Sequence, residues 1–180
     1  MPTATQLRSD VALLVREAES DMSALWRDAD TADELEAALR DILPGLIDAY
    51  GSAVATVAAD WYDDVRDEVG ARGRFVAIPA EIRDTGAQAL VGWALAEAQD
   101  VSTFRTLVAG GAQRRIANFA RFTVQASSVA DPRAQGWLRV GEGACKSGWC
   151  NQYLDGEIRA VAYDFPAHDN CNCHAEPAWL

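Results

Sequence analysis

The chain has 180 residues, of which 49% are apolar, and it carries a net charge of −11. This apolar fraction is enough for a packed core and excludes wholesale disorder, while the length predicts one ordinary domain, or one with a small appendage. The opening Met-Pro-Thr-Ala-Thr lacks the features of a secretory signal, and the longest apolar run is about half a membrane span. We therefore expect no membrane contact, and a reducing compartment where clustered cysteines more often bind metal than form disulfides.

The charge is distributed unevenly along the chain. Residues 1–100 carry twenty acidic residues and eight arginines, whereas residues 101–140 carry six arginines and one aspartate. An acidic front and a basic middle predict two different contact surfaces. The simpler interpretation is a set of solvated helix faces, in which arginine stems cover apolar surface. The six arginines are Arg105, Arg114, Arg115, Arg121, Arg133 and Arg139.

The first part of the chain has the periodicity of helices. Apolar residues recur every three or four positions over residues 5–28, which predicts an amphipathic helix. Thr31 and Glu34 form a capping box that starts a second helix. Pro44 cannot donate a helical hydrogen bond, so either a new helix starts at Pro44 or one long helix kinks there. Gly70 is expected to end this region.

Two further helices are expected before a change of composition. Residues 75–79 predict a connector, and Pro79 is well placed to start a helix over residues 80–99. Ser102 is a suitable N-cap for the last helix. Within that helix the pair Gly110-Gly111 predicts a kink. Together these patterns predict a bundle of four to six helices over residues 1–130.

The segment Asp131-Pro-Arg-Ala-Gln-Gly-Trp breaks the helical pattern and is the best candidate for a domain boundary. Beyond it the elements are short, glycines and aromatics are frequent, and residues 157–163 alternate like a half-buried strand. A tail this small usually needs a metal or disulfide staple, because it cannot build a sufficient core alone. The predicted fold class is therefore mainly α, with a small zinc-stabilised α+β subdomain over residues 131–180.

Four cysteines and two histidines, which are all that the chain contains, lie within the thirty residues 145–174. Thiolates and imidazoles are the preferred ligands of tetrahedral zinc, and two short pairs joined by a longer loop are a usual way to supply them. Disulfides and inert structural thiols are the alternatives. His174 is the weakest candidate ligand. The predicted structural Zn²⁺ site consists of Cys145, Cys150, His168 and Cys171, with Cys173 as a substitute for Cys171.

Catalytic signatures are missing from the sequence. A metal site with four protein ligands is closed, and hence structural rather than catalytic. The chain contains no His-Glu-x-x-His, no zinc-deaminase signature, no Walker loop, no Gly-x-Ser-x-Gly and no dinucleotide glycine fingerprint. Because both histidines lie in the cysteine cluster, little remains for acid–base chemistry. We expect no enzymatic activity.

Several stretches of the tail resemble the phage Mu F-like family, and most closely the short minor capsid (head morphogenesis) proteins of actinobacteriophages. The specific match covers about residues 131–179. One departure is the spacing of the first cysteine pair, which is tighter in the family. The matching stretches are Asp131-Pro-Arg-Ala-Gln-Gly-Trp-Leu-Arg-Val, the pair Cys145 and Cys150, Phe165-Pro-Ala-His-Asp-Asn-Cys-Asn-Cys, and Glu176-Pro-Ala-Trp.

The resemblance implies a structural component of the virion head, made in the host cytoplasm and located inside the head near the portal. The implied partners are the portal protein, the major capsid protein or both, with contact to packaged DNA; some members leave the head with the DNA. The oligomeric state is not indicated. The alternative interpretation is a zinc-stapled nucleic-acid-binding module that uses the arginines of residues 101–140, although the net charge of −11 argues against it.

Overall fold

The computed structural model describes residues 3–27, 31–141 and 148–180. It is mainly helical, with four α-helices, 62% helix and a small two-stranded sheet near the C-terminus, which confirms the predicted fold class. The elements are α1 (Ala4–Trp26), α2 (Ala32–Glu68), α3 (Ala87–Glu97), α4 (Val101–Ala130), β1 (Ala134–Val140), the 3₁₀ helix η1 (Trp149–Tyr153) and β2 (His174–Trp179).

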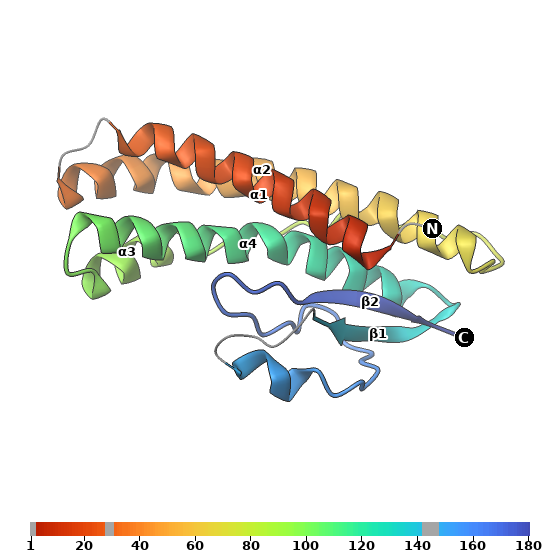
Figure 1. Ribbon diagram of the computed structural model, residues 1–180. Helices are drawn as coiled ribbons and strands as arrows, with labels where there is room; N and C mark the ends of the chain where they lie inside the picture. The colour runs from red at the N-terminus through yellow and green to blue at the C-terminus, as the bar shows by residue number, and fades with distance from the viewer. Residues whose placement is uncertain (1–2, 28–30, 142–147) are drawn as a thin grey trace.

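Helices α2 and α4 form the centre of the bundle, and α1 lies along both of them (Figure 1). The short helix α3 packs on α2 and α4 near the start of α4. Strands β1 and β2 pair antiparallel, with Val140 opposite His174, and the pair packs on α4. One continuous core cluster therefore runs from α1 to the tail, because α4 contributes to both sides of it.

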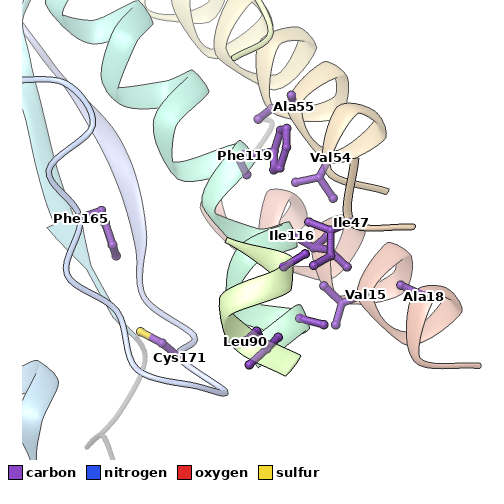
Figure 2. Packing of buried hydrophobic residues seen from close by; sticks show 14 of the residues in the cluster. Val15, Ala18, Ile47, Val54, Ala55, Leu90, Ile116, Phe119, Phe165 and Cys171 are labelled. Carbon is purple, nitrogen blue, oxygen red and sulfur yellow. The ribbon is translucent and has the colours of Figure 1, made fainter. Parts of the chain in front are cut away.

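The contact between α2 and α4 depends on a glycine. Phe119 of α4 points toward Val54 and Ala55 of α2 (Figure 2), and its ring lies against Gly51 one turn earlier. A Cβ added at Gly51 would lie only 2.4 Å from Cε2 of Phe119. Glycine is therefore required at this position, because any side chain would collide with the buried ring.

Pro44 lies inside a single continuous helix, so the alternative of a new helix starting there is wrong. A proline has no N–H, and the carbonyl four residues earlier therefore loses its helical partner. That carbonyl belongs to Arg40, and it accepts a hydrogen bond from the side-chain amide of Gln88 on α3. A neighbouring helix thus supplies the donor that the proline removed.

The stretch Asp33–Glu68 of α2 is long and apolar enough to cross a membrane by length and composition. The core helix of a globular protein passes the same test. In this bundle Leu39, Leu43 and Ile47 have no exposed surface, and α2 packs against α1, α3 and α4. Packing in the core therefore accounts for the apolar character of the helix.

The predicted helix over residues 80–99 is wrong in its first part. Helix α3 starts only at Ala87, and residues 71–86 form an irregular strap that returns from the end of α2 toward α3 (Figure 1). Side chains of other elements hold the strap open: Asp63 Oδ1 accepts from the amide of Ala77 at 2.9 Å, and Thr123 Oγ1 accepts from the amide of Ala80 at 2.9 Å. These tertiary hydrogen bonds outcompete the local helical tendency.

One prediction about helix α4 also needs correction. The N-cap is Asp100 and not Ser102, because Asp100 Oδ1 accepts from the amide of Thr103 at 2.7 Å. The helix is continuous through Gly110 and Gly111. These glycines allow close packing: a Cβ at Gly111 would lie 2.3 Å from a methyl carbon of Leu90 on α3.

The predicted strand over residues 157–163 is also wrong. Within the described tail, these residues make only an isolated bridge, in which Arg159 exchanges two backbone hydrogen bonds with Trp137. Tyr163 adopts a φ of 64°, which ends the extended run. The paired strands are β1 and β2, whose shorter apolar patterns did not stand out in the sequence.

A buried ion pair joins the end of α2 to the start of the tail. Arg66 Nε donates to Asp131 Oδ2 at 2.7 Å, and both residues are at most 4% exposed. Tyr62 donates to the same oxygen at 3.4 Å, and burial raises the pKa of its hydroxyl. Because α4 ends at Ala130, this pair fixes the direction in which the chain leaves the bundle.

Two glycines of α2 give opposite predictions for the same substitution. We expect Gly51→Ala to destabilise the protein by about 1–3 kcal/mol, because the new methyl group collides with Phe119. Gly45→Ala should stabilise it by about 1 kcal/mol, because Gly45 has no atom within 4 Å of an added Cβ and alanine favours the helix. Urea unfolding of both variants measures the difference, and equal effects would contradict the packing described here.

Candidate metal centre

A four-residue turn brings two of the predicted ligands together. The amide of Cys171 donates to the carbonyl of His168 at 3.2 Å, which closes the turn His168-Asp-Asn-Cys171. Asn170 occupies its third position with a φ of 59°, a left-handed conformation that asparagine tolerates better than most residues. The turn therefore presents the imidazole and the thiol from the same short loop.

The third ligand comes from the short helix η1. Gly148, with a φ of 70°, precedes this helix and allows the tight entry that places Cys150 in its first turn. Sγ of Cys150 lies 3.6 Å from Sγ of Cys171, and ligand atoms of Cys150, His168 and Cys171 all lie within 4.8 Å of one another. Both cysteines are buried and His168 is half-buried. These three residues can hold a metal ion.

A backbone carbonyl lies beside one ring nitrogen of His168. Its Nδ1 lies 2.6 Å from the carbonyl oxygen of Asp169, which is a partner for a protonated Nδ1. In that tautomer the lone pair is on Nε2, and metal-ligating histidines are commonly fixed in this way by a backbone carbonyl. The ring of Trp149 stands edge-on to the imidazole at 5.8 Å and restricts its rotation.

Arg139 of β1 supplies positive charge beside the sulfur atoms. Its Nη2 lies 3.4 Å from Sγ of Cys150 and 3.7 Å from Sγ of Cys171. The guanidinium stacks over the ring of Phe165 at 4.3 Å, and the residue is only 4% exposed. A buried cation at this distance favours thiolates over thiols, because it offsets the cost of burying negative charge.

Arg121 of α4 holds the backbone of the ligand loop. Its Nη2 donates to the carbonyl of Cys171 at 2.6 Å, and its Nε donates to the carbonyl of Cys173 at 3.0 Å. The third donor reaches Asn118 Oδ1 at 2.8 Å. Complete burial lowers the pKa of Arg121 to about 10, so the side chain stays protonated at neutral pH. The loop is thereby fixed to α4 by a charged donor that water does not reach.

Cys173 is buried next to Cys171. A hydrogen bond from Cys173 and the charge of Arg121 lower the pKa of Cys171, while the same hydrogen bond and burial raise the pKa of Cys173. The hydrogen bond between the two groups thus favours a thiolate at Cys171 and a protonated thiol at Cys173. This is the electrostatic environment of a thiolate ligand rather than of an inert thiol.

The turn is also anchored on the surface of α4. Gln113 Oε1 accepts from the amide of Asn170 at 2.9 Å, and Arg114 Nε lies 3.3 Å from a carboxylate oxygen of Asp169. Gly110 allows the turn to lie this close to α4, since an added Cβ would be only 3.2 Å from Cβ of Asp169. Gly110 therefore gives the turn His168-Asp-Asn-Cys171 room to lie against α4.

The structure brings together three of the five predicted ligands and places a fourth beside them. Cys145 lies outside the described residues, so its role stays a prediction. Cys173 is adjacent to the cluster without being one of its three members. His174, the weakest candidate, lies on β2, where its Nε2 is 2.8 Å from Glu176 Oε1.

Arg121 and Arg139 are the residues that the sequence analysis missed. Both had been grouped with the basic face of residues 101–140, yet they are 3% and 4% exposed. A signal was present, because Arg121 has the apolar residues Ala117 and Val124, both buried, at helical spacing on either side. Arg139 likewise alternates with Trp137 on the buried face of β1.

The remaining arginines of this region do not form a free basic face either. Each donates to a group of the protein itself: Arg105 to the carbonyl of Trp26, Arg115 to that of Thr85, and Arg133 to that of Arg72. Arg114 is engaged with the ligand turn. Of the six arginines of the predicted basic surface, Arg121 and Arg139 are therefore buried, and the other four connect α4 and β1 to their neighbours while they remain half-buried or exposed.

Comparison with known proteins identifies the family. The model of the VG15 protein family matches residues 2–179, and the chain therefore belongs to the VG15 family. This is a family of phage virion genes, so the chain is a virion-associated phage protein. The finding agrees with the phage origin implied by the tail motifs, while the finer resemblance to the phage Mu F-like minor capsid proteins stays a prediction. No curated protein and no solved structure matches the chain.

Loss of single sulfur ligands tests the metal centre. We expect Cys150→Ser and Cys171→Ser each to weaken metal binding more than about 100-fold, because changes outside the ligand shell already cost 10–100-fold. Titration of the reduced protein with Co²⁺, followed through the thiolate charge-transfer absorption, measures this. Of the remaining two cysteines, Cys145→Ser should weaken binding more than Cys173→Ser. Unchanged binding in Cys150→Ser would contradict the site.

The left-handed turn gives a separate prediction. Asn170→Ala should lower the free energy of unfolding by about 1 kcal/mol, because alanine is disfavoured at a φ near +60°. Asn170→Gly should have little effect, since glycine adopts this conformation freely. Both variants keep all sulfur ligands, so thermal unfolding compares them under identical metal loading. A larger loss in the glycine variant would show that the asparagine side chain matters more than the backbone.

Proposed function

We propose that this protein is a non-enzymatic minor capsid (head morphogenesis) protein, located inside the phage head, which binds the portal protein or the inner capsid shell. A structural zinc ion holds its tail to the helical bundle. The observation that carries this proposal is the match to the VG15 family, because it covers residues 2–179 and supports a role in the virion for the chain as a whole. The tail motifs add the finer assignment through their resemblance to minor capsid proteins.

The geometry of the cluster supports zinc as the metal. Two thiolates bound to one tetrahedral zinc ion at about 2.3 Å would lie about 3.8 Å apart. The observed separation of 3.6 Å between Sγ of Cys150 and Sγ of Cys171 agrees with this arrangement, whereas a disulfide needs about 2.05 Å. Sulfur and imidazole ligands also favour zinc over magnesium or calcium. When bound, the ion supplies a covalent-like cross-link between η1 and the ligand turn.

The surroundings of the cluster support a structural role for the ion. Arg139 and Arg121 occupy the space beside the sulfur atoms and the loop carbonyls, and both are almost completely buried. A catalytic metal needs an accessible open position and a nearby base. The groups around this cluster are instead hydrogen-bonded to the protein's own backbone. This favours a metal that stabilises the tail over one that binds substrate.

The nucleic-acid-binding alternative lacks a favourable observation. Binding to a phosphate backbone needs cations that can exchange their partners for phosphates. Arg121 and Arg139 are buried, and the others in residues 101–140 donate to carbonyls or to the ligand turn. We therefore do not extend the proposal to DNA binding by this region.

Virion incorporation and metal content together test the proposed function. In heads purified from the phage that encodes the chain, the protein should be present and should cross-link to the portal or to the inner shell. Purified reduced protein should contain one zinc per chain, which Cys150→Ser should lose together with the fold of the tail. Asn151→Ser is the matched control, because it changes the neighbouring exposed residue and should leave zinc and incorporation intact.

The two parts of the proposal fail in different ways. Absence of the chain from purified heads would overturn the head location even if zinc is bound. Protein that folds normally without metal would overturn the structural zinc and leave the virion association intact. Equal incorporation of Cys150→Ser and Asn151→Ser would show that the metal-held tail is not needed for assembly.

A further inference from the structure

A groove separates α1 from the start of β2. Its volume of about 510 Å³ lies within the range of ligand-binding clefts. Residues of α1, of α4 and of the segment 171–175 line it, and α4 packs against both α1 and β2. Arg16 of α1 and Asn172 of the tail are exposed, so the groove is open to solvent between them.

The groove is long and narrow. Its lining extends from Thr5 to Glu19 on α1 and from Gln113 to Val124 on α4. The fourteen residue steps on α1 correspond to a length of about 21 Å, and the volume then gives a mean cross-section of about 24 Å². A second helix, with a diameter of about 10 Å, is too wide for this space, whereas an extended chain fits it.

Much of the lining is aliphatic. Val11 and Val15 of α1 contribute to it together with Ala117, Ala120 and Val124 of α4. The described residues around the groove include no phenylalanine, tyrosine or tryptophan. Single-stranded nucleic acids are usually bound through aromatic rings on which their bases stack. The lining therefore suits the aliphatic side chains of a peptide better than nucleobases.

The charge of the groove is opposite to that of the chain. Among the described residues, its lining has three arginines and one acidic residue, whereas the whole chain has 16 basic and 27 acidic residues. Arg16 makes no hydrogen bond or ion pair with any residue that the structure describes. Arg121 adds a buried charge, which solvent screens little. The groove therefore attracts an anionic occupant. The four charged residues are Arg8, Arg16, Arg121 and Glu19.

A buried acceptor in the lining lacks a partner. His174 lines the groove and is only 7% exposed. Its Nε2 lies 2.8 Å from Glu176 Oε1, which is a partner for a protonated Nε2, so the lone pair is on Nδ1. This Nδ1 is buried and has no hydrogen-bond partner within the described part of the chain. Buried polar atoms are normally paired, and a backbone N–H of a bound peptide would supply the missing donor.

We propose that this groove binds an extended acidic segment of a partner protein. Arg8 and Arg16 are eight residues apart on α1, or about 12 Å, and four residues of an extended chain span about 13 Å. Carboxylates four residues apart therefore reach both arginines. An aliphatic residue midway between the carboxylates faces the aliphatic lining, because alternate side chains of an extended chain point the same way. The recognised pattern is acidic-x-aliphatic-x-acidic.

The inference deepens the proposed function, on which it rests for the presence of a partner in the phage head. Synthetic peptides test it on the reduced, zinc-loaded, full-length protein. The probe is fluorescein-labelled Gly-Ser-Glu-Ser-Leu-Ser-Glu-Ser-Gly, and fluorescence anisotropy measures its binding. We expect saturable binding that weakens at least about tenfold when both glutamates are replaced by lysine, because the charge complementarity is lost. Glutamates two residues apart should weaken it several-fold, because they no longer span both arginines.

Charge reversal on the protein separates recognition from folding. The double variant Arg8→Glu/Arg16→Glu should bind the glutamate peptide at least about tenfold more weakly. It should bind the lysine peptide instead, which a merely structural effect would not produce. Arg27→Glu is the matched control, because Arg27 is an exposed arginine at the end of α1 outside the groove, and it should leave binding unchanged. Circular dichroism checks that each variant stays folded.

The outcomes separate the groove from the head location. No saturable binding, binding that the double variant retains, or a double variant that rejects the lysine peptide would overturn the inference. Tighter binding of oligothymidylate than of the glutamate peptide would overturn it in favour of nucleic acid. Peptide binding by a chain that is absent from purified heads would support the groove and overturn the head location. Presence in heads without peptide binding would overturn the groove and leave the head location intact.

Discussion

The tail of this protein depends on one buried cation. Arg121 projects from α4 into the space below the ligand loop and donates to the carbonyls of Cys171 and Cys173. Burial of a guanidinium is costly unless its nitrogens have hydrogen-bond partners, and here the third nitrogen, Nη1, donates to Asn118. The loop therefore has to adopt the conformation that offers these carbonyls. Positions of the metal ligands, of β2 and of the aromatic residue Phe165 follow from that requirement.

The metal and the buried arginines compensate for the small size of the tail. A tail of about fifty residues cannot bury enough apolar surface to fold alone. Here it borrows α4 as one wall of its core, and Phe165 fills the space between the guanidinium groups of Arg121 and Arg139. The thiols of Cys150 and Cys171 face Arg139 from the other side. A metal ion at the centre of the cluster would then join two loops whose negative thiolate charge is already offset by the arginines of the protein.

In the helical bundle, too, one element supplies a group that another element lacks. Pro44 removes a hydrogen bond from the middle of α2, and Gln88 of α3 replaces it. Gly51 removes a side chain from α2, and Phe119 of α4 occupies the space. Asp63 and Thr123 hold the strap in a form that its own residues do not favour. In each case a local weakness of one element is matched by a residue that is distant in the sequence.

The sequence alone determined some features of this protein, and only the tertiary structure decided the others. Signals with a fixed short spacing were sufficient for most of the helical regions and for the capping box at Thr31, because the partners lie within a few residues, and the clustering of all cysteines and histidines in thirty residues indicated the ligand cluster. The strap, the strand pair and the burial of Arg121 could not be predicted in this way, since each depends on hydrogen-bond partners that are distant in the sequence. The sequence around an arginine in an amphipathic helix does not show whether its side chain faces water or a loop of backbone carbonyls. Only the packing of the tail on α4 decides between the two.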